Sequence, residues 1–421
     1  MTGNAIPINT TAEEMPPDQC NAEKPPHITY FIASAWTINC LAYSIIYPFI
    51  PLYLHQDRGI PMTKVGTIFP LMGLATIAAP PLWGYLTDRF GRRPIMQLGQ
   101  IGRAAVFGSL ALAAYLQAPF EIFAGLLMLS AAVGAAFQVA ANSYLADITS
   151  PENREISVGR ISVGCNVGWA FGPMLGSFLS SIPFYYLFGI TATLCTVCWG
   201  VCWVFCPEPE RKNSEKKEKL PFSVMLKNTI LMELIAYVFL LSLLTSQLFS
   251  TMSVFATSDV GILRKTLGVI YSVNGFTIIL CQQPMTMLLN QLKAMTSRRL
   301  LLGTVLFAIG FAIMGFCSNA WHMACSVLIL TLGELTVFPA LFAALAKIAP
   351  PGKLGMTMAS RSLAEGMGAA VGPWLGALAY AQWRGMPPLL WSILVIPAIL
   401  SGIGFLRMGK HINQQDNNQR I

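Results

Sequence analysis

Charged residues are scarce in this sequence of 421 residues. Asp, Glu, Lys and Arg together make up 11% of it, while hydrophobic residues make up 54%. A soluble domain usually carries about 25% charged residues, so this chain has too few to cover a soluble surface. A surface in contact with lipid requires apolar side chains instead. The apolar runs are long and continuous, unlike the short alternating strands of a membrane barrel, and they predict membrane-spanning helices.

The sequence also lacks the residue patterns of enzymes and metal proteins. Its four histidines lie in tails or at loop edges, and no P-loop pattern (G-x-x-x-x-G-K-[ST]) occurs, so ATP is not expected to drive the protein directly. Most of the ten cysteines lie inside apolar runs. Cys195, Cys198, Cys202 and Cys206 follow one helical face with no histidine or carboxylate among them, and we expect them to pack as small side chains. No cofactor, metal site or catalytic residue is predicted.

Twelve apolar segments are long enough for a helix to cross a bilayer, which takes about 20 residues. We predict them at 29–54, 65–86, 94–116, 121–146, 158–180, 183–206, 229–255, 266–289, 299–317, 321–346, 356–381 and 386–407. A charged break with a proline at each end, Pro207–Pro221, separates the sixth segment from the seventh. The expected organisation is an all-α membrane protein with five parts: a tail (1–28), a six-helix bundle (29–206), a linker (207–228), a second six-helix bundle (229–407) and a second tail (408–421).

Lysine and arginine are distributed unevenly between alternate loops, and this distribution predicts the orientation. The net charge of +8 is not gathered on a soluble module with interleaved aromatic residues, so nucleic acid is not an expected partner. With the N-terminus in the cytoplasm, the outer loops hold few basic residues, namely Arg58, Lys64, Arg264, Lys265 and Arg384. We therefore expect both termini in the cytoplasm. The first 27 residues lack the basic and apolar regions of a cleaved signal, and we expect them to be a disordered tail.

The two predicted bundles repeat each other. Leu145-Ala-Asp-Ile-Thr-Ser-Pro151 corresponds to Leu345-Ala-Lys-Ile-Ala-Pro-Pro351, and Gly168-x-x-x-Gly172-Pro173-x-x-Gly176 corresponds to Gly368-x-x-x-Gly372-Pro373-x-x-Gly376. Both pairs are offset by 200 residues, from 145 to 345 and from 168 to 368. A shared offset across two separate motifs indicates a duplicated unit. We expect two halves related by a pseudo-twofold axis, with a cavity between them.

The most specific motif is Gly84-Tyr-Leu-Thr-Asp88-Arg89-Phe-Gly91-Arg92-Arg93-Pro94, between the second and third predicted spans. Gly84 allows close helix packing, and Gly91 can adopt a positive φ in a tight turn. Asp88 can form charge-assisted hydrogen bonds with arginines that break and re-form as helices rock. Here the chain resembles the major facilitator superfamily, whose loop signature G-x-L-x-D-R-x-G-R-R matches at every specified position. The resemblance implies twelve helices in two bundles and transport by alternating access. Arginines that only enforced orientation would not require Asp88 or the glycines.

The equivalent loop of the second half, residues 290–299, keeps a basic pair and loses the acid, so any ionic latch would be asymmetric. By similarity to the charge cluster of the superfamily, Asp147 is a candidate partner for Arg92 or Arg93. The alternative is that Asp147 caps the following turn.

The motif from Gly168 to Gly176 exposes backbone for close packing, while Pro173 removes a hydrogen bond and bends its helix. It is similar to the span-five signature of the drug:proton antiporter branch of the superfamily, which is associated with exporters. Two positions depart from that branch. Ser177 stands where a second glycine is usual, and Ser130 stands where the fourth span usually has an arginine. Helix packing alone is the alternative explanation of the glycines.

Two ionisable residues lie deep within predicted spans. Glu334 is near the middle of the tenth span, where an ionised carboxylate costs several kcal/mol, so we expect it to be protonated or paired and suited to reversible proton binding. It resembles a Gly-Glu in the tenth helix of some multidrug transporters of the superfamily. The alternative role is a structural hydrogen bond to a threonine or the backbone. Arg103 lies about 15 Å along the third span from Arg93, and it is expected to face the cavity, to form a structural ion pair or to lie at the interface.

Polar residues within other spans are candidates for the cavity wall, because such residues face protein or water rather than lipid. Asn39, Tyr43 and Tyr47 are spaced by four and share a face of the first span, as Gln138 and Asn142 do in the fourth. The isolated amides within spans are Asn166, Gln247 and Asn274. Each of these residues could instead hold helices together.

These features favour a monomeric secondary transporter of a bacterial inner membrane. Its expected partners are a small-molecule substrate, protons and the lipid bilayer. The favoured function is proton-coupled efflux of small amphipathic compounds, in which Glu334 exchanges a proton and meets the substrate. A carrier for a specific metabolite, sugar or siderophore is the alternative, and a membrane-embedded enzyme or a non-transporting receptor is a remoter one.

Overall fold

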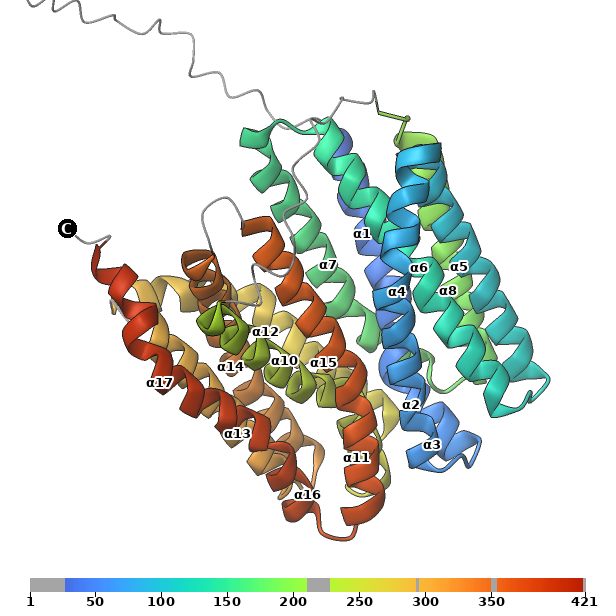
Figure 1. Ribbon diagram of the computed structural model, residues 1–421. Coiled ribbons are helices and arrows are strands. Elements are labelled where there is room, and N and C mark those ends of the chain that lie inside the picture. The colour runs from blue at the N-terminus through green and yellow to red at the C-terminus, as the bar shows by residue number, and fades with distance from the viewer. Residues whose placement is uncertain (1–26, 210–227, 293–294, 350–353, 419–421) are drawn as a thin grey trace, which may run out of the picture.

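The computed structural model describes residues 27–209, 228–292, 295–349 and 354–418, and all regular structure within these ranges is helical (Figure 1). Most of the predicted N-terminal tail and most of the predicted linker lie outside them. The expectation of an all-α membrane protein is confirmed.

The helices of the first half are α1 (Ile28–Ser44), α2 (Ile50–Leu52), α3 (Met62–Gly66), α4 (Ile68–Phe90), α5 (Arg92–Tyr115), α6 (Phe120–Ile148), α7 (Pro151–Leu179) and α8 (Phe184–Phe205). Those of the second half are α10 (Thr229–Thr245), α11 (Thr251–Ser258), α12 (Arg264–Gln291), α13 (Thr296–Met314), α14 (Ala320–Ile348), α15 (Leu354–Trp383), α16 (Pro387–Leu394) and α17 (Ile396–Asn418).

Each predicted span coincides with a helical segment of the structure, although the helices often run past the apolar stretch. For example, α7 begins before the predicted start of its span, because Pro151 suits the first turn and the Ser150 side chain accepts a hydrogen bond from the amide of Asn153. Within the described residues, eight segments are long and apolar enough to cross a membrane by length and composition. Four long helices fall short, namely α5, α7, α12 and α15. Three of them, α7, α12 and α15, lie where the two halves meet, so part of their surface faces protein rather than lipid.

The first helix of each half is interrupted near its end. In the first half, α1 is followed by a 3-10 turn, η2 (Tyr47–Phe49), which contains Pro48, and then by α2 and a π-helical turn, η3 (Tyr53–Asp57). In the second half, α10 is followed by a 3-10 turn, η4 (Ser246–Phe249), and α11. The interruptions fall at corresponding places, as expected for a duplicated unit.

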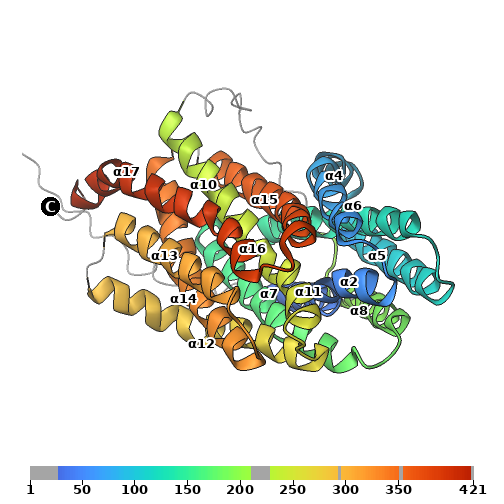
Figure 2. The same ribbon diagram turned by 90° about the horizontal axis from the view of Figure 1, so that it is seen from below.

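The helices of each half pack mainly on one another. In the first half α1 packs on α7, and α5 on α6 and α8; in the second, α10 packs on α15, and α13 on α14 and α17. The halves meet through two helix pairs, α7 with α12 and α4 with α15, and α3 also contacts α15. Figure 2 shows the halves side by side, with α7 near the centre.

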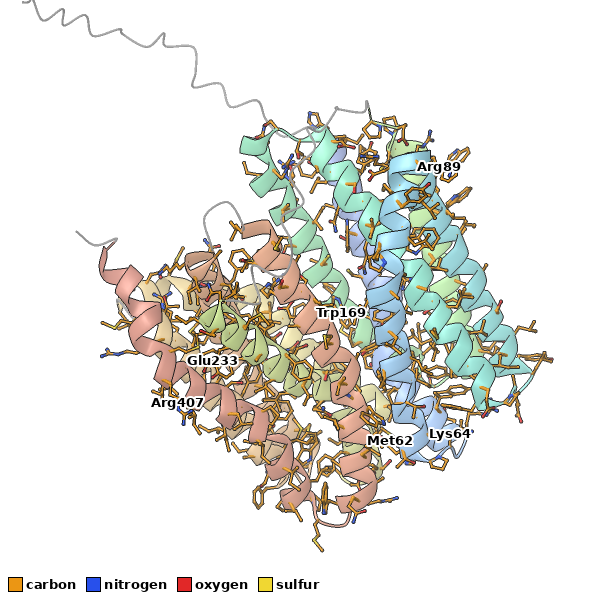
Figure 3. The ribbon with its side chains drawn as sticks, viewed as in Figure 1. Met62, Lys64, Arg89, Trp169, Glu233 and Arg407 are labelled. Atoms are coloured by element: carbon orange, nitrogen blue, oxygen red, sulfur yellow. The ribbon has the colours of Figure 1, made fainter. Side chains whose placement is uncertain are left out.

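The two halves are in closest contact at one end of the molecule. We call the end that carries the Asp88–Arg93 loop the motif end and the other the far end; Figure 3 labels Arg89 at the first and Met62 and Lys64 at the second. A Cβ added at Gly66 would lie 2.6 Å from Ala377 Cβ, and one at Gly73 would lie 2.1 Å from Ala370 Cβ. Real Cβ atoms do not approach this closely, so only glycine allows α3 and α4 to lie against α15 here.

The second helix pair uses the same device. A Cβ added at Gly268 would lie 2.0 Å from Ser177 Cβ, and one at Gly275 would lie 2.5 Å from Ala170 Cα. In contrast, Gly84, Gly159 and Gly366, on the parts of α4, α7 and α15 toward the motif end, would meet nothing within 4 Å. The tight contact between the halves is therefore at the far end, and the ribbons diverge toward the motif end (Figure 1).

Polar contacts also join the halves at the far end. Arg264 donates two hydrogen bonds to the Asp57 carboxylate, at 2.6 and 2.9 Å, and a third to Gln56 Oε1 at 2.9 Å. Gln56 Nε2 donates to the hydroxyls of Thr257 and Ser258 at 2.7 and 2.8 Å. These bonds connect the segment after α2 with α11 and the start of α12.

Candidate functional site

Two adjoining cavities lie between the halves, about halfway along the molecule. Their volumes are about 280 and 350 Å³, and they share four wall residues, Tyr43, Tyr47, Trp169 and Ala369. We call them the first and second lobes. Figure 3 labels Trp169 near the centre of the molecule, between the two groups of helices. The lobes therefore meet at a shared wall that is largely aromatic.

The aromatic residues of this shared wall contact each other. The rings of Tyr43 and Tyr47 stack at 4.8 Å, and the Trp169 ring lies edge-on to both, at 6.0 and 6.2 Å. Phe249, which lines the second lobe, lies 5.4 Å from Trp169. Stacked and edge-to-face rings are the preferred arrangements of aromatic pairs, so this wall is an ordered apolar surface.

Arg103, on α5, is the charged residue of the first lobe. Its side chain is only 4% exposed, and its Nη1 donates a 2.7 Å hydrogen bond to Asn39 Oδ1. The same oxygen accepts a 2.9 Å bond from Gln100 Nε2, one helical turn before Arg103. The guanidinium lies 5.6 Å from the Tyr43 ring and 5.7 Å from that of Phe107. Arg103 thus faces the cavity, one of the three positions expected from the sequence.

The position of Arg103 depends on a glycine of the neighbouring helix. A Cβ added at Gly134 would lie 3.2 Å from Arg103 Cδ and 3.3 Å from its Nε. Ser130 lies about one turn before Gly134 on α6, is buried and donates its hydroxyl to Leu127 O at 2.9 Å. The related branch has its span-four arginine at the position of Ser130. The Arg103 side chain therefore packs against α6 about one turn from that position.

Glu334, on α14, is the carboxylate of the second lobe. Its Oε2 accepts a 3.0 Å hydrogen bond from Asn274 Nδ2, which also donates to Thr331 Oγ1 at 2.9 Å. Within the described chain, no lysine or arginine forms an ion pair with Glu334. An amide rather than a charge therefore fixes the carboxylate at the cavity wall.

The other predicted cavity residues divide into several groups. Asn39 and Gln138 line the first lobe, and Tyr43 and Tyr47 line both. Asn274 is outside the lining and positions Glu334, so it is not an isolated amide. Asn142 and Asn166 are exposed and are not among the residues that line either lobe.

Gln247 holds helices together. It is fully buried, and its Nε2 donates to Gly372 O at 2.7 Å while its Oε1 accepts from Thr251 Oγ1 at 2.7 Å. Its amide is thereby used within the second half, between η4 and α15. This is the packing alternative that the sequence left open for these amides.

The two glycine-proline motifs pack helices within each half. A Cβ added at Gly172 would lie 1.8 Å from Ser44 Oγ, and one at Gly176 would lie 2.0 Å from Ile45 O, so α7 lies directly on α1. In the second half, a Cβ added at Gly372 would lie 2.1 Å from Ser246 Oγ and one at Gly376 1.9 Å from Gln247 Oε1. Gly168 and Gly368 approach α1 and α10 in the same way, and Pro173 and Pro373 lie inside their helices.

The loop at the motif end is organised around Arg92. Its Nε donates to Asp147 Oδ2 at 2.8 Å, and its Nη1 lies 3.2 Å from Asp88 Oδ1. Gly91 has φ of 107°, which favours glycine at the turn between α4 and α5. Asp147 therefore pairs with Arg92 rather than Arg93, and Ser150, not Asp147, caps the following helix.

Glu208, just beyond α8, is a residue that the sequence did not single out. Its two carboxylate oxygens accept 2.8 Å hydrogen bonds from the backbone amides of Arg92 and Arg93 at the start of α5. A carboxylate there satisfies amides that have no partner within the helix and interacts favourably with the helix dipole. Arg93 Nη2 also donates to Trp203 O at 2.6 Å, so the end of α8 and the motif loop form one unit.

The comparison with known protein families decides the identity of this arrangement. The sequence profile of the Major Facilitator Superfamily matches residues 32–302 and 256–417. The chain belongs to the Major Facilitator Superfamily. It is therefore a multi-pass membrane transporter that carries a small-molecule substrate, and it is not an enzyme.

Within the Major Facilitator Superfamily the chain is similar to two kinds of resistance protein. It is 24% identical over 394 residues to the tetracycline resistance protein, class C, of Escherichia coli, with 87% of this chain and 94% of the relative aligned. It is 26% identical over 384 residues to the multidrug resistance protein MdtG of Dickeya zeae (strain Ech586), with 87% and 91% aligned.

The fold is also that of solved transporter structures. A bacterial homologue of the human lysosomal transporter Spinster superposes with a TM-score of 0.77, covering 91% of this chain and 96% of that one at 14% sequence identity. At this identity the likeness shows the fold alone.

Proposed function

We propose that this transporter couples the export of small amphipathic compounds to the entry of protons. The observation that carries the proposal is Glu334, a carboxylate in the wall of an aromatic-lined cavity whose described hydrogen-bond donor is the neutral amide of Asn274. In a membrane span, a carboxyl group without a basic partner is more stable in its protonated, neutral form than in its ionised form. Proton binding at Glu334 can therefore change the charge of the cavity in each transport cycle.

In this proposal the residues 29–206 and 229–407 are two bundles that rock about the central cavity. With the motif end in the cytoplasm of a bacterial inner membrane, as the basic loops favour, the far-end contacts close the outer side. The conformation described above is then inward-facing. Outward opening requires separation of the Gly66, Gly73, Gly268 and Gly275 contacts and breakage of the Arg264–Asp57 pair.

The motif loop has a different part in the cycle. Asp88 is the exposed member of its ion pair, with 76% of its side chain accessible, whereas Arg92 and Asp147 are largely covered. We propose that the Arg92–Asp147 pair and the Glu208 contacts keep the loop rigid, while Asp88 remains free to change partners as the bundles move. A monomer contains every one of these elements, so no second copy is needed for transport.

The test uses purified protein in proteoliposomes with an imposed proton gradient. The probes are ethidium, norfloxacin and norfloxacin methyl ester, and a pH-sensitive dye inside the vesicles reports proton movement. We expect the gradient to drive accumulation of at least one probe, and that probe to drive proton movement in turn. In Glu334→Gln, proton movement should fall to the level of protein-free vesicles while probe exchange without a gradient continues.

Glu233→Gln is the matched control. Glu233 lies on α10, accepts a hydrogen bond from Tyr237 and lines neither lobe, so the same substitution should leave coupling intact. Substrate-driven proton movement that persists in Glu334→Gln contradicts the assignment of coupling to this residue.

A further inference from the structure

The two lobes of the cavity carry opposite charges at separate places. Arg103 lines the first lobe and Glu334 the second, and aromatic residues shared by the two lie between them. In the part of the chain that the structure describes, the two residues do not form an ion pair with each other or with any other residue. The cavity is thus polarised along its length.

Glu334 can lose its charge by binding a proton, whereas a guanidinium does not lose its proton in proteins. The charge of Arg103 therefore has the greater need of a partner. A buried charge is costly unless it is paired, and charged residues within membrane spans usually pair with one another. Here the described hydrogen-bond acceptor is the neutral oxygen of Asn39, supplemented by the faces of two aromatic rings. The amide oxygen and the ring faces carry only partial negative charge, so they stabilise the guanidinium less than a carboxylate would.

Unused hydrogen-bond donors accompany this charge. Arg103 Nε is buried without a hydrogen-bond partner among the described residues. Trp36 Nε1 is also buried without a hydrogen-bond partner among the described residues, and Trp36 lines the same lobe. A buried donor without an acceptor costs free energy. An anionic group in the first lobe would compensate the charge of the guanidinium, and a small rotation of the Arg103 and Trp36 side chains would bring the buried donors to its oxygens.

We propose that the transported compounds are amphipathic molecules with an acidic group, and that this group binds in the first lobe at Arg103 and Trp36. This proposal names the substrate class for the transport function proposed above and rests on that function. The aromatic or alicyclic body of the molecule packs against Tyr43, Tyr47 and Trp169. The opposite end, a basic or hydrogen-bond-donating group, reaches the second lobe beside Glu334.

The dimensions of the cavity agree with such a compound. The lobes, of about 280 and 350 Å³, share a wall. Taken together they fall within the usual range for drug-sized ligands, about 300 to 1,000 Å³. A zwitterion with a fused bicyclic body could bring its acid to one lobe and its amine to the other. A simple lipophilic cation would leave the guanidinium of Arg103 without a counter-charge.

Norfloxacin and two derivatives provide a matched set of probes. Norfloxacin carries a carboxylate and an amine on a bicyclic ring, its methyl ester lacks the acid, and its N-acetyl derivative lacks the basic amine. Binding to the full-length protein in lipid nanodiscs can be followed by the fluorescence of the ring. We expect the wild-type protein to bind norfloxacin at least tenfold more tightly than the ester, the factor typical of one charge-assisted hydrogen bond.

Substitutions at Arg103 and Trp36 should remove this preference for the acid. In Arg103→Gln, affinity for norfloxacin and the N-acetyl derivative should fall at least tenfold while affinity for the ester changes little. Arg103→Lys keeps the charge and should retain part of the preference. Trp36→Phe keeps an aromatic ring and loses the N–H, so it should weaken binding of the two acids severalfold and leave the ester unaffected.

Arg361→Gln is the matched control. Arg361 is also partly buried within a helix, but it forms an ion pair with Glu365 and lines neither lobe. It should change the affinities for all three probes by the same factor, and thermal unfolding of each variant shows whether the fold persists.

Three results overturn the proposal. One is a wild-type protein that does not prefer the acid over its ester. Another is an Arg103→Gln variant, folded by its thermal transition, in which all three affinities fall equally. The third is an Arg103→Gln variant whose affinity for norfloxacin is unchanged, which would mean that another group binds the acid. Proton-coupled transport of the ester that disappears in Glu334→Gln would still support the proposed function in each of these cases.

Discussion

The contact between Gly73 and Ala370 offers a way to shift the balance between the two conformations of the transport cycle. A Cβ at position 73 would lie 2.1 Å from Ala370 Cβ, whereas two carbon atoms in contact are usually about 3.5 to 4.0 Å apart. In Gly73→Ala, α4 and α15 must therefore separate by about 1.5 Å at this point. Overpacking of this kind typically costs about 1 to 3 kcal/mol.

This cost applies only while the far end is closed, because the two residues separate when it opens. The equilibrium should thus shift by about 5-fold to 150-fold toward the conformation that is open at the far end. The double variant Gly73→Ala with Ala370→Gly removes the opposing methyl group and should return the equilibrium close to that of the wild type. Gly125→Ala, on α6, is the control, since a Cβ there meets nothing within 4 Å.

Distances between nitroxide labels at positions 116 and 316 provide the assay. Leu116 and Phe316 are exposed at the far ends of α5 and α13, with 65% and 71% of their surface accessible. Double electron–electron resonance should show a larger population at long distance in Gly73→Ala and not in Gly125→Ala. An unchanged distance distribution in Gly73→Ala, or a failure of Ala370→Gly to reverse the shift, would refute the role assigned to this contact.

Three further predictions concern contacts outside the cavity. Asp57→Asn removes the charge partner of Arg264 and should favour far-end opening by about 1 kcal/mol or less, an effect that high salt reduces. The same distance measurement checks this. Glu121→Gln should have no effect in it, because the pair of Glu121 with Lys64 lies within the first half. Glu208→Ala should destabilise the start of α5 by about 1 kcal/mol and accelerate hydrogen exchange at the amides of Arg92 and Arg93. Asp88→Asn should leave these amides protected, because the described ion pair of Asp88 is with the side chain of Arg92. Gly172→Ala should lower the free energy of unfolding by about 1 to 3 kcal/mol, because its Cβ would overlap Ser44 Oγ. Thermal unfolding checks this, with Gly159→Ala on the same helix as the control. Equal stability of the two variants contradicts the packing argument.

The helices and the loop motif could be predicted because their signals are local. Apolar runs predict helices wherever the chain must satisfy its own backbone within lipid, and the signature from Gly84 to Arg93 is contiguous. The ends of the helices were less predictable, since α7 starts at a proline with a serine cap rather than at the first apolar residue.

Contacts between distant segments were harder to predict. The repeat was detected from motifs offset by 200 residues, but Gly66 and Gly268 are 202 residues apart, as are Gly73 and Gly275. The 200-residue offset therefore does not relate these glycines, although they lie against residues that do follow it, Ala370 with Ala170 and Ala377 with Ser177. The signal available was the spacing of 7 residues, two helical turns, from Gly66 to Gly73 in one half and from Gly268 to Gly275 in the other.

The same limit applies to the cavity. Glu334 and Arg103 were recognised by their unusual depth in the membrane, a property of each residue alone. Their partners, Asn274 and Asn39, come from other helices, and only the folded structure shows which amide meets which charge. Glu208 gave no signal, because a carboxylate in a charged linker is ordinary until its position beside α5 is known.

The position of Glu208 also determines where this protein could be divided into two separately expressed chains. Its carboxylate belongs to the segment after α8, yet it binds the start of α5 within the same half. A first chain that ended at Phe205 would lose this contact and expose two backbone amides of the motif loop. A first chain that continued through Pro209 would keep it, and the partner chain could then begin ahead of Asn228, whose side chain caps α10. Complementation between such fragments should therefore depend on only a few residues at the boundary.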